Sequence, residues 1–187
     1  MALLERELQK TYPDARVINS GIGGNTSTQM LARLDQDVLS HHPQVTLVMT
    51  GLNDAEYIDP GAIPRDTPRV SLDVFADQLR QIIRRVRDGG GRVLLLTPNP
   101  MTGKYPYASL GYYKGHEINS ALESYAASVR SVALETHTDL VDVYAAWIHM
   151  PNYDRFLPDG VHPNREGHRR IAELILPRLL NIMQAPR

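Results

Sequence analysis

Short apolar runs alternate with longer segments of helical periodicity along most of this chain. The apolar runs cover residues 46–50, 93–96 and 140–143. Between the first two lies the clearest helical pattern, in which apolar residues recur at helical spacing from Leu72 to Val86. Runs that are apolar on both faces are typical of buried parallel strands. Strands that alternate with helices in this way predict an α/β fold, with a parallel sheet between two layers of helices.

The rest of the chain extends this pattern. Helical spacing predicts further helices over about 3–12, 30–42, 117–135 and 165–183, and the apolar run Arg16–Asn19 predicts one more strand. Ser71 and the glycines 89–91 are the expected start and stop of the central helix. We find no internal repeat and no low-complexity segment that would divide the chain. Residues 1–187 are therefore expected to form a single domain.

Length and charge limit the possible partners. A chain of 187 residues is long enough to bury one apolar core. It carries 20 basic and 21 acidic residues, so its net charge is −1. This balance gives no field that would favour a nucleic acid or an anionic membrane as a partner. We expect a small substrate without strong charge, and the sequence does not predict an oligomeric state.

The absence of cysteine and the N-terminal residues exclude several classes of site and of protein. The chain has no cysteine, which rules out disulfides, thiolate nucleophiles and thiolate zinc sites. Glu5 and Glu7 interrupt the apolar residues near the N-terminus, so no signal peptide is expected. The apolar runs are also far shorter than the roughly 20 residues that cross a bilayer. The expectation is a chain without a membrane partner, cytoplasmic by default although its compartment is otherwise unknown.

Two polar segments follow predicted strands, at the edge where parallel sheets bind ligands. The first is the glycine-rich stretch Asn19–Ser27, whose backbone N–H groups are suited to an anion or a developing oxyanion. The second is Thr50–Asp54, in which the Asn53 side chain offers an amide donor of the same kind. Each has a structural alternative: the first stretch is a tight turn, and Asn53 and Asp54 cap a turn.

A third polar segment, Leu157–Asn164, sets Asp159 three positions before His162. A neutral imidazole is a competent base near neutral pH, and a carboxylate on its Nδ1–H fixes the tautomer and stabilises the imidazolium. The alternative is an exposed loop histidine near an aspartate by chance. His168 falls in the last predicted helix, and without further ligands no metal site is expected there.

Taken together, the segments Asn19–Ser27, Gly51–Asp54 and Asp159–His162 resemble three of the sequence blocks of the SGNH hydrolases, also called the GDSL esterase and lipase family. Their order matches that of the family, and the resemblance covers essentially the whole chain. It implies a three-layer, flavodoxin-like α/β/α fold. It also implies hydrolysis of small carboxylic esters through a covalent acyl-serine, with no metal or other cofactor.

The resemblance also assigns roles to individual residues. It implies that Gly24 supplies a backbone N–H and Asn53 a side-chain amide to the oxyanion hole. It implies that Asp159 orients His162, which acts as the base. The loop 98–114 is rich in tyrosine, and Tyr105, Tyr107 and Tyr112 are candidates to line the substrate pocket. A surface loop packed by its own aromatic rings is the alternative.

The chain departs from the family in one respect, because it contains no Gly-Asp-Ser tripeptide. In the family this block ends the first strand and supplies the nucleophilic serine. The resemblance places that strand inside the sheet, between the strands at 17–18 and 47–48. We therefore expect an N-terminally shortened form of an active esterase that lacks the first family strand and is inactive or weakly active by itself. The alternatives are a nucleophile relocated to Ser20 or Ser27, and a non-catalytic binding or scaffold protein that keeps the pocket.

Overall fold

The computed structural model describes residues 2–185, and a parallel sheet of three strands lies at its centre. β4 (Arg92–Leu96) pairs on one side with β1 (Val45–Met49) and on the other with β5 (Asp139–Val141). In the first ladder Val45 faces Arg92, and the register continues to the pair Met49 and Leu96. Because all three strands run in the same direction, their carboxyl ends meet at one edge of the sheet.

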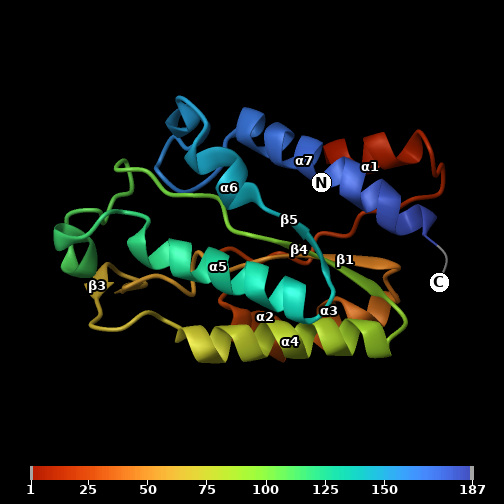
Figure 1. The fold of residues 1–187 in the computed structure, drawn as a ribbon, viewed down its shortest axis with the longest axis horizontal. Coiled ribbons are helices and arrows are strands. Elements are labelled where there is room, and N and C mark those ends of the chain that lie inside the picture. The colour runs from red at the N-terminus through yellow and green to blue at the C-terminus, as the bar shows by residue number, and fades with distance from the viewer. Residues whose placement is uncertain (1, 186–187) are drawn as a thin grey trace.

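Helices cover both faces of this sheet, as Figure 1 shows. On one face lie α4 (Leu72–Asp88) and α5 (Ser120–Glu135), with α2 (Ser27–Ala32) packed against α4. On the other face α7 (Arg165–Gln184) packs against α1 (Ala2–Gln9). The predicted three-layer α/β/α fold with a parallel sheet is confirmed.

The central strand contributes to a separate apolar cluster on each face. Val93 and Leu95 of β4 pack under α4 and α5, whereas Leu94 and Leu96 belong to the cluster that α1 and α7 cover. This follows from strand geometry, because successive side chains point to opposite faces of a sheet. All four side chains are buried.

The central predicted helix is confirmed as α4. Ser71 occupies the N-cap position with extended backbone geometry, and Gly89 follows the last helical residue. Five apolar residues of the predicted pattern are buried, Phe75, Leu79, Ile82, Ile83 and Val86. Gln78 is buried with them, whereas Leu72 at the start of the pattern is 40 % exposed.

The predicted strand at 16–19 is wrong. None of these residues belongs to a helix or a strand of the described chain. The backbone N–H of Val17 donates to the Glu5 carboxylate at 3.2 Å instead of to a neighbouring strand, and Ile18 is 54 % exposed. Apolar, β-branched residues form a strand only where a ladder partner is in reach, and β1 has no such contact with this segment.

The helix predicted over 30–42 is broken into shorter pieces. The chain leaves helical geometry at Arg33 and again at Val38, so that α3 (Leu34–Asp37) and the 3-10 turn η1 (Leu39–His41) follow α2. The sequence pattern also missed several short elements: the hairpin β2 (Ile58–Asp59) and β3 (Ile63–Pro64), the 3-10 turns η2 (Gly111–Gly115) and η3 (Tyr153–Phe156), and α6 (Val143–Ile148).

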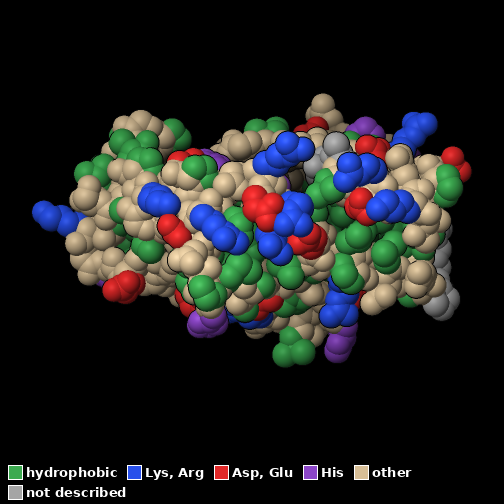
Figure 2. Space-filling model, turned by 90° about the horizontal axis from the view of Figure 1, so that it is seen from above, with side chains coloured by type: hydrophobic (Ala, Val, Ile, Leu, Met, Phe, Trp, Pro, Cys, Tyr) green, Lys and Arg blue, Asp and Glu red, His purple; other side chains and the backbone are tan. Residues whose placement is uncertain are grey.

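The face that α1 and α7 form carries charges of both signs, side by side (Figure 2). On α7, Arg169 pairs with Glu166 at 2.5 Å and also with Glu173, and Arg170 reaches Glu166 at 3.3 Å. This mixed surface agrees with the balanced composition. Within residues 2–185 no helix combines the length and the apolar character that crossing a bilayer would take.

Candidate active site

The loop with Asp159 and His162 lies between η3 and α7, and two hydrogen bonds of Asn164 hold its C-terminal end. At its end, Asn164 caps α7, because its side-chain oxygen accepts a hydrogen bond from the Gly167 N–H at 2.9 Å. The Asn164 amide also donates to the Arg155 carbonyl at 2.9 Å. Residues 159–162 therefore lie directly before a helix start whose position is fixed by a cap.

Asp159 and His162 form a hydrogen-bonded pair. Asp159 Oδ2 lies 2.7 Å from His162 Nδ1, and Asp159 Oδ1 accepts from the backbone N–H groups of Val161 at 3.1 Å and His162 at 2.8 Å. The His162 side chain is 81 % exposed. The carboxylate thus fixes one ring nitrogen and leaves the imidazole open to a solute, which is the arrangement that an orienting acid and a base require.

The surroundings of Asp159 keep its side chain ionised. Burial alone would raise its pKa, but the hydrogen bonds from His162 and Val161 outweigh that effect and lower the pKa to about 2. At neutral pH the group is therefore a carboxylate. A carboxylate at Nδ1 favours the protonated imidazole that forms when a histidine accepts a proton.

Residues that follow β4 attach this loop to the carboxyl edge of the sheet. The Asn99 amide donates to the Val161 carbonyl at 3.0 Å, and the Thr102 N–H donates to the Gly160 carbonyl at 2.9 Å. Asn99 is only 4 % exposed, so the first of these bonds is shielded from water. The Asp159–His162 pair consequently lies at the edge where the strands end.

The two predicted oxyanion donors lie on loops that contact each other. Gly24 has a φ of +79°, a conformation that favours glycine, and nothing lies within 4 Å of the position of a Cβ. The Asn53 amide donates at 2.9 Å to the carbonyl of Asn25, the residue after Gly24. Because a side-chain amide has two N–H groups, Asn53 retains one for a ligand.

A buried aspartate binds the same two loops together. Asp54 is fully buried and accepts from the N–H and the hydroxyl of Ser27 at 2.8 and 2.5 Å. It also accepts from the Thr50 hydroxyl at 3.0 Å and the Gly51 N–H at 3.2 Å. The contacts with Thr50 and Gly51 agree with the alternative that Asp54 caps a turn. Sequence reasoning missed its second contact, because Ser27 is 27 positions away.

The serines proposed as relocated nucleophiles are both engaged elsewhere. Ser27 is 0 % exposed, and its hydroxyl donates to Asp54. The Ser20 hydroxyl donates to the Asp37 carbonyl at 2.6 Å. Within the described residues no hydrogen bond joins either serine to His162. These contacts place neither Ser20 nor Ser27 as the partner of His162.

The tyrosines of the loop 98–114 contact one another and two rings outside the loop, Tyr57 and His116. The ring of Tyr112 stacks on Tyr57 and on His116, with centroids 3.9 and 4.0 Å apart. Tyr105 is buried and meets the ring of Tyr107 edge-on at 5.3 Å. These contacts agree with the alternative of a loop packed by its own rings. A role of Tyr105, Tyr107 and Tyr112 in substrate binding stays a prediction.

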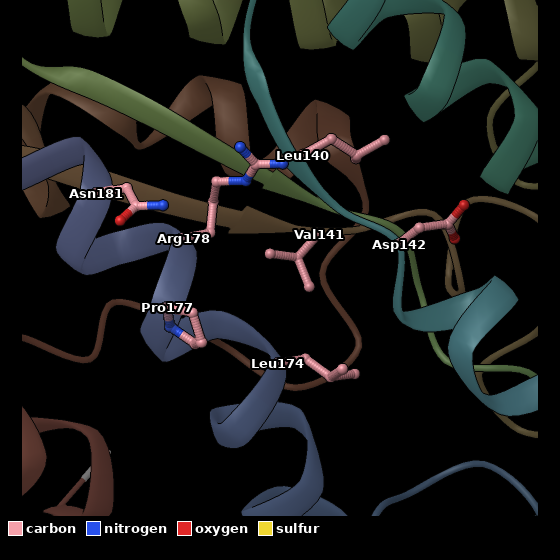
Figure 3. A pocket seen from close by; sticks show the side chains of 7 residues that line it. All are labelled: Leu140, Val141, Asp142, Leu174, Pro177, Arg178 and Asn181. Carbon is pink, nitrogen blue, oxygen red and sulfur yellow. The ribbon is translucent and has the colours of Figure 1, made fainter.

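The cavity in Figure 3 lies elsewhere, between β5 and α7. It has a volume of about 410 Å³, and the side chains of Val141, Leu174 and Arg178 are among those that line it. Neither Asp159 and His162 nor Gly24 and Asn53 belong to its lining. The candidate active site at the carboxyl edge of the sheet is therefore separate from this cavity. Among residues 2–185 no group of three or more His, Cys, Asp or Glu side chains is placed to hold a metal ion.

Comparison with known proteins identifies the family of this chain. The sequence model of the GDSL-like lipase/acylhydrolase family matches residues 1–170. The chain belongs to this family. It is 30 % identical over 179 residues to an acetylxylan esterase of Geobacillus stearothermophilus, a match that covers 90 % of this chain and 75 % of the relative. It is 28 % identical over 164 residues to thioesterase 1/protease 1/lysophospholipase L1 of Escherichia coli strain K12, covering 87 % and 66 % of the two chains.

Solved structures support the fold of this GDSL-like chain. The lipase/acylhydrolase of Enterococcus faecalis superposes with a TM-score of 0.78 at 23 % identity and covers 95 % of this chain and 83 % of its own. An acetyl xylan esterase, AlAXEase, gives a TM-score of 0.76 at 23 % identity, with 95 % and 89 % covered. The resemblance to the GDSL family that the sequence motifs predicted is confirmed, and the family is one of esterases and acylhydrolases.

Proposed function

We propose that this GDSL-like chain is the greater part of a hydrolase of small carboxylic esters that works through an acyl-serine, with the nucleophilic serine outside its 187 residues. The observation that carries the proposal is the Asp159–His162 pair, with 2.7 Å between Oδ2 and Nδ1 and an exposed imidazole. Acetyl and other short acyl esters are the proposed substrates. The names of the relatives support acetylated carbohydrate as the first class to test.

The proposed reaction assigns one role to each group. The serine oxygen bonds to the acyl carbon while its proton passes to His162, which returns that proton to the departing alcohol. The N–H of Gly24 and the amide of Asn53 donate to the oxyanion of the tetrahedral intermediate. Water then attacks the acyl-serine with His162 again as base, which releases the acid and restores the serine.

Hydrolysis of p-nitrophenyl acetate tests the proposal. The 187-residue chain is expected to give little turnover, and a longer natural form with an in-frame Gly-Asp-Ser is expected to be active. In that longer form, His162→Ala should lower kcat/KM by about a thousandfold, since the serine loses its base. His168→Ala is the matched control, because His168 is exposed on α7 and is expected to leave the rate unchanged.

Labelling with a fluorophosphonate distinguishes the alternatives. The 187-residue chain should remain unlabelled, since Ser27 is buried and Ser20 is engaged with Asp37. A label on either serine would instead show a relocated nucleophile. A longer natural form that hydrolyses no ester, and whose ligand binding is unaffected by His162→Ala, would support a non-catalytic binding protein.

A further inference from the structure

The carboxylate of Glu56 joins two hydrogen bonds that lead to different loops. Its Oε2 accepts from Arg69 Nη1 at 3.2 Å, and its Oε1 accepts from the Tyr105 hydroxyl at 2.7 Å. The side chains of Glu56 and Arg69 are 16 % and 15 % exposed, and Tyr105 is 5 % exposed. Hydrogen bonds to a charged group are about twice as strong as neutral ones, and little water competes for them here.

On one side, Arg69 extends this contact to the glycine-rich loop. Arg69 Nη2 donates to the Gly24 carbonyl at 3.3 Å. The backbone N–H of Arg69 also donates to the Glu56 carbonyl at 2.9 Å, so the two residues are fixed beside each other. The Glu56 carboxylate therefore holds one guanidinium nitrogen while a second one reaches the loop of the candidate oxyanion hole.

On the other side, Tyr105 extends the contact to the loop of the Asp159–His162 pair. Gly160 approaches the Tyr105 backbone so closely that an added Cβ would lie 2.2 Å from its nitrogen. Thr102 completes the attachment, since its N–H donates to the Gly160 carbonyl and its own carbonyl accepts from the Tyr105 N–H at 3.0 Å. Burial and the Glu56 carboxylate raise the pKa of Tyr105, so its hydroxyl remains a donor at neutral pH.

We propose that Glu56 is a positioning residue that, through Arg69 and Tyr105, sets the spacing between Gly24 and the Asp159–His162 pair. Displacements of about 1 Å between reacting groups can cost a hundredfold in rate, so a rigid connection between these loops has a direct effect on catalysis. That catalytic consequence rests on the proposed function. The connection itself does not, because it exists in the 187-residue chain.

Amide hydrogen exchange in the 187-residue chain tests the connection. The reporters are the Gly160 N–H, bonded to Leu157, and the Asn25 N–H, bonded to Ile22. Tyr105→Phe should speed exchange at Gly160 by about tenfold and leave Asn25 unchanged. Arg69→Met should speed exchange at Asn25 by about tenfold and leave Gly160 unchanged. Glu56→Gln should speed both. The matched control is Glu135→Gln, which disrupts the exposed Arg80–Glu135 pair (2.8 Å) and should affect neither reporter.

Two results would overturn the proposal. One is unchanged exchange at both reporters in Glu56→Gln. The other is an equal acceleration in β4 and in both loops for every variant, since this would show only a loss of global stability. In an active longer form, Glu56→Gln should lower kcat about tenfold and change KM less than about twofold. If the variants show the expected exchange pattern but the longer form hydrolyses no ester, the proposed function is rejected and the positioning role of Glu56 stands.

Discussion

At position 160 the backbone has a φ of +90° and faces the main chain of Lys104 and Tyr105. Two independent constraints meet here, since a side chain would be strained by the dihedral angle and would also contact backbone atoms. Those atoms cannot rotate away as the end of a flexible side chain can. The glycine between Asp159 and His162 is thus part of the geometry of the pair.

Gly160→Ala should therefore be one of the most damaging small changes in the chain. We expect the free energy of unfolding to fall by about 3 kcal/mol, combining strain and overpacking. Urea unfolding measures this. Gly103→Ala is the control, because nothing lies within 4 Å of its Cβ position and its φ is not in the left-handed region, so a change below about 0.5 kcal/mol is expected. Equal effects of the two variants would contradict the close contact.

The depressed pKa of Asp159, about 2, predicts a pH-dependent contribution to stability. In an unfolded chain an aspartate titrates near about 3.9. Because the folded pKa is the lower one, the contribution is fully present above about pH 4 and is lost as the pH falls toward 2. The stability difference between the original chain and Asp159→Asn should accordingly shrink as the pH falls from 4 toward 2. A difference that grows as the pH falls from 4 to 2 would exclude the lowered pKa of Asp159.

Helix α4 illustrates how far element prediction from sequence reaches. Its apolar spacing is regular and its termini carry Ser71 and Gly89, so local signals alone locate it. The run 16–19 has equally strand-like residues but no ladder, because strand formation depends on a neighbour that the local sequence does not specify. The Asp159–His162 pair was predictable because its members lie three residues apart. The contact of Glu56 with Arg69 was not, because a separation of 13 residues carries no periodic signal.

A substitution on the inward face of α4 should be costly. Leu79 is 0 % exposed, so Leu79→Ala removes buried methyl groups and leaves a cavity. We expect a loss of about 3 kcal/mol in the free energy of unfolding, measured with urea. Val74→Ala is the control on the same helix, because Val74 is 43 % exposed and a loss below about 1 kcal/mol is expected. A comparable loss in both would contradict the assigned face of α4.

At the scale of the whole molecule, the order β1-β4-β5 makes β4 the only strand of this sheet that is paired on both sides within residues 2–185. β1 pairs with β4 alone, so its other side presents backbone groups without a strand partner there. Such edges are the less protected part of a sheet.

Hydrogen exchange should reveal this asymmetry. We expect the amides of β4 to exchange slowest, and within β1 the amides that point away from β4 to exchange much faster than the alternate ones that point toward it. Measurement by NMR resolves single residues. If all amides of β1 were protected as well as those of β4, another strand would have to cover this edge in solution.

The two apolar clusters that share β4 determine which substitutions should affect one another. Leu94 and Leu95 are adjacent in the sequence, yet the first packs beside α1 and α7 and the second beside α4 and α5. Substitutions at these two neighbouring positions therefore act on different apolar clusters, one on each side of the sheet. Leu95 and Leu79 lie far apart in the gene but share one cluster, and it is between such distant positions that compensating changes should arise.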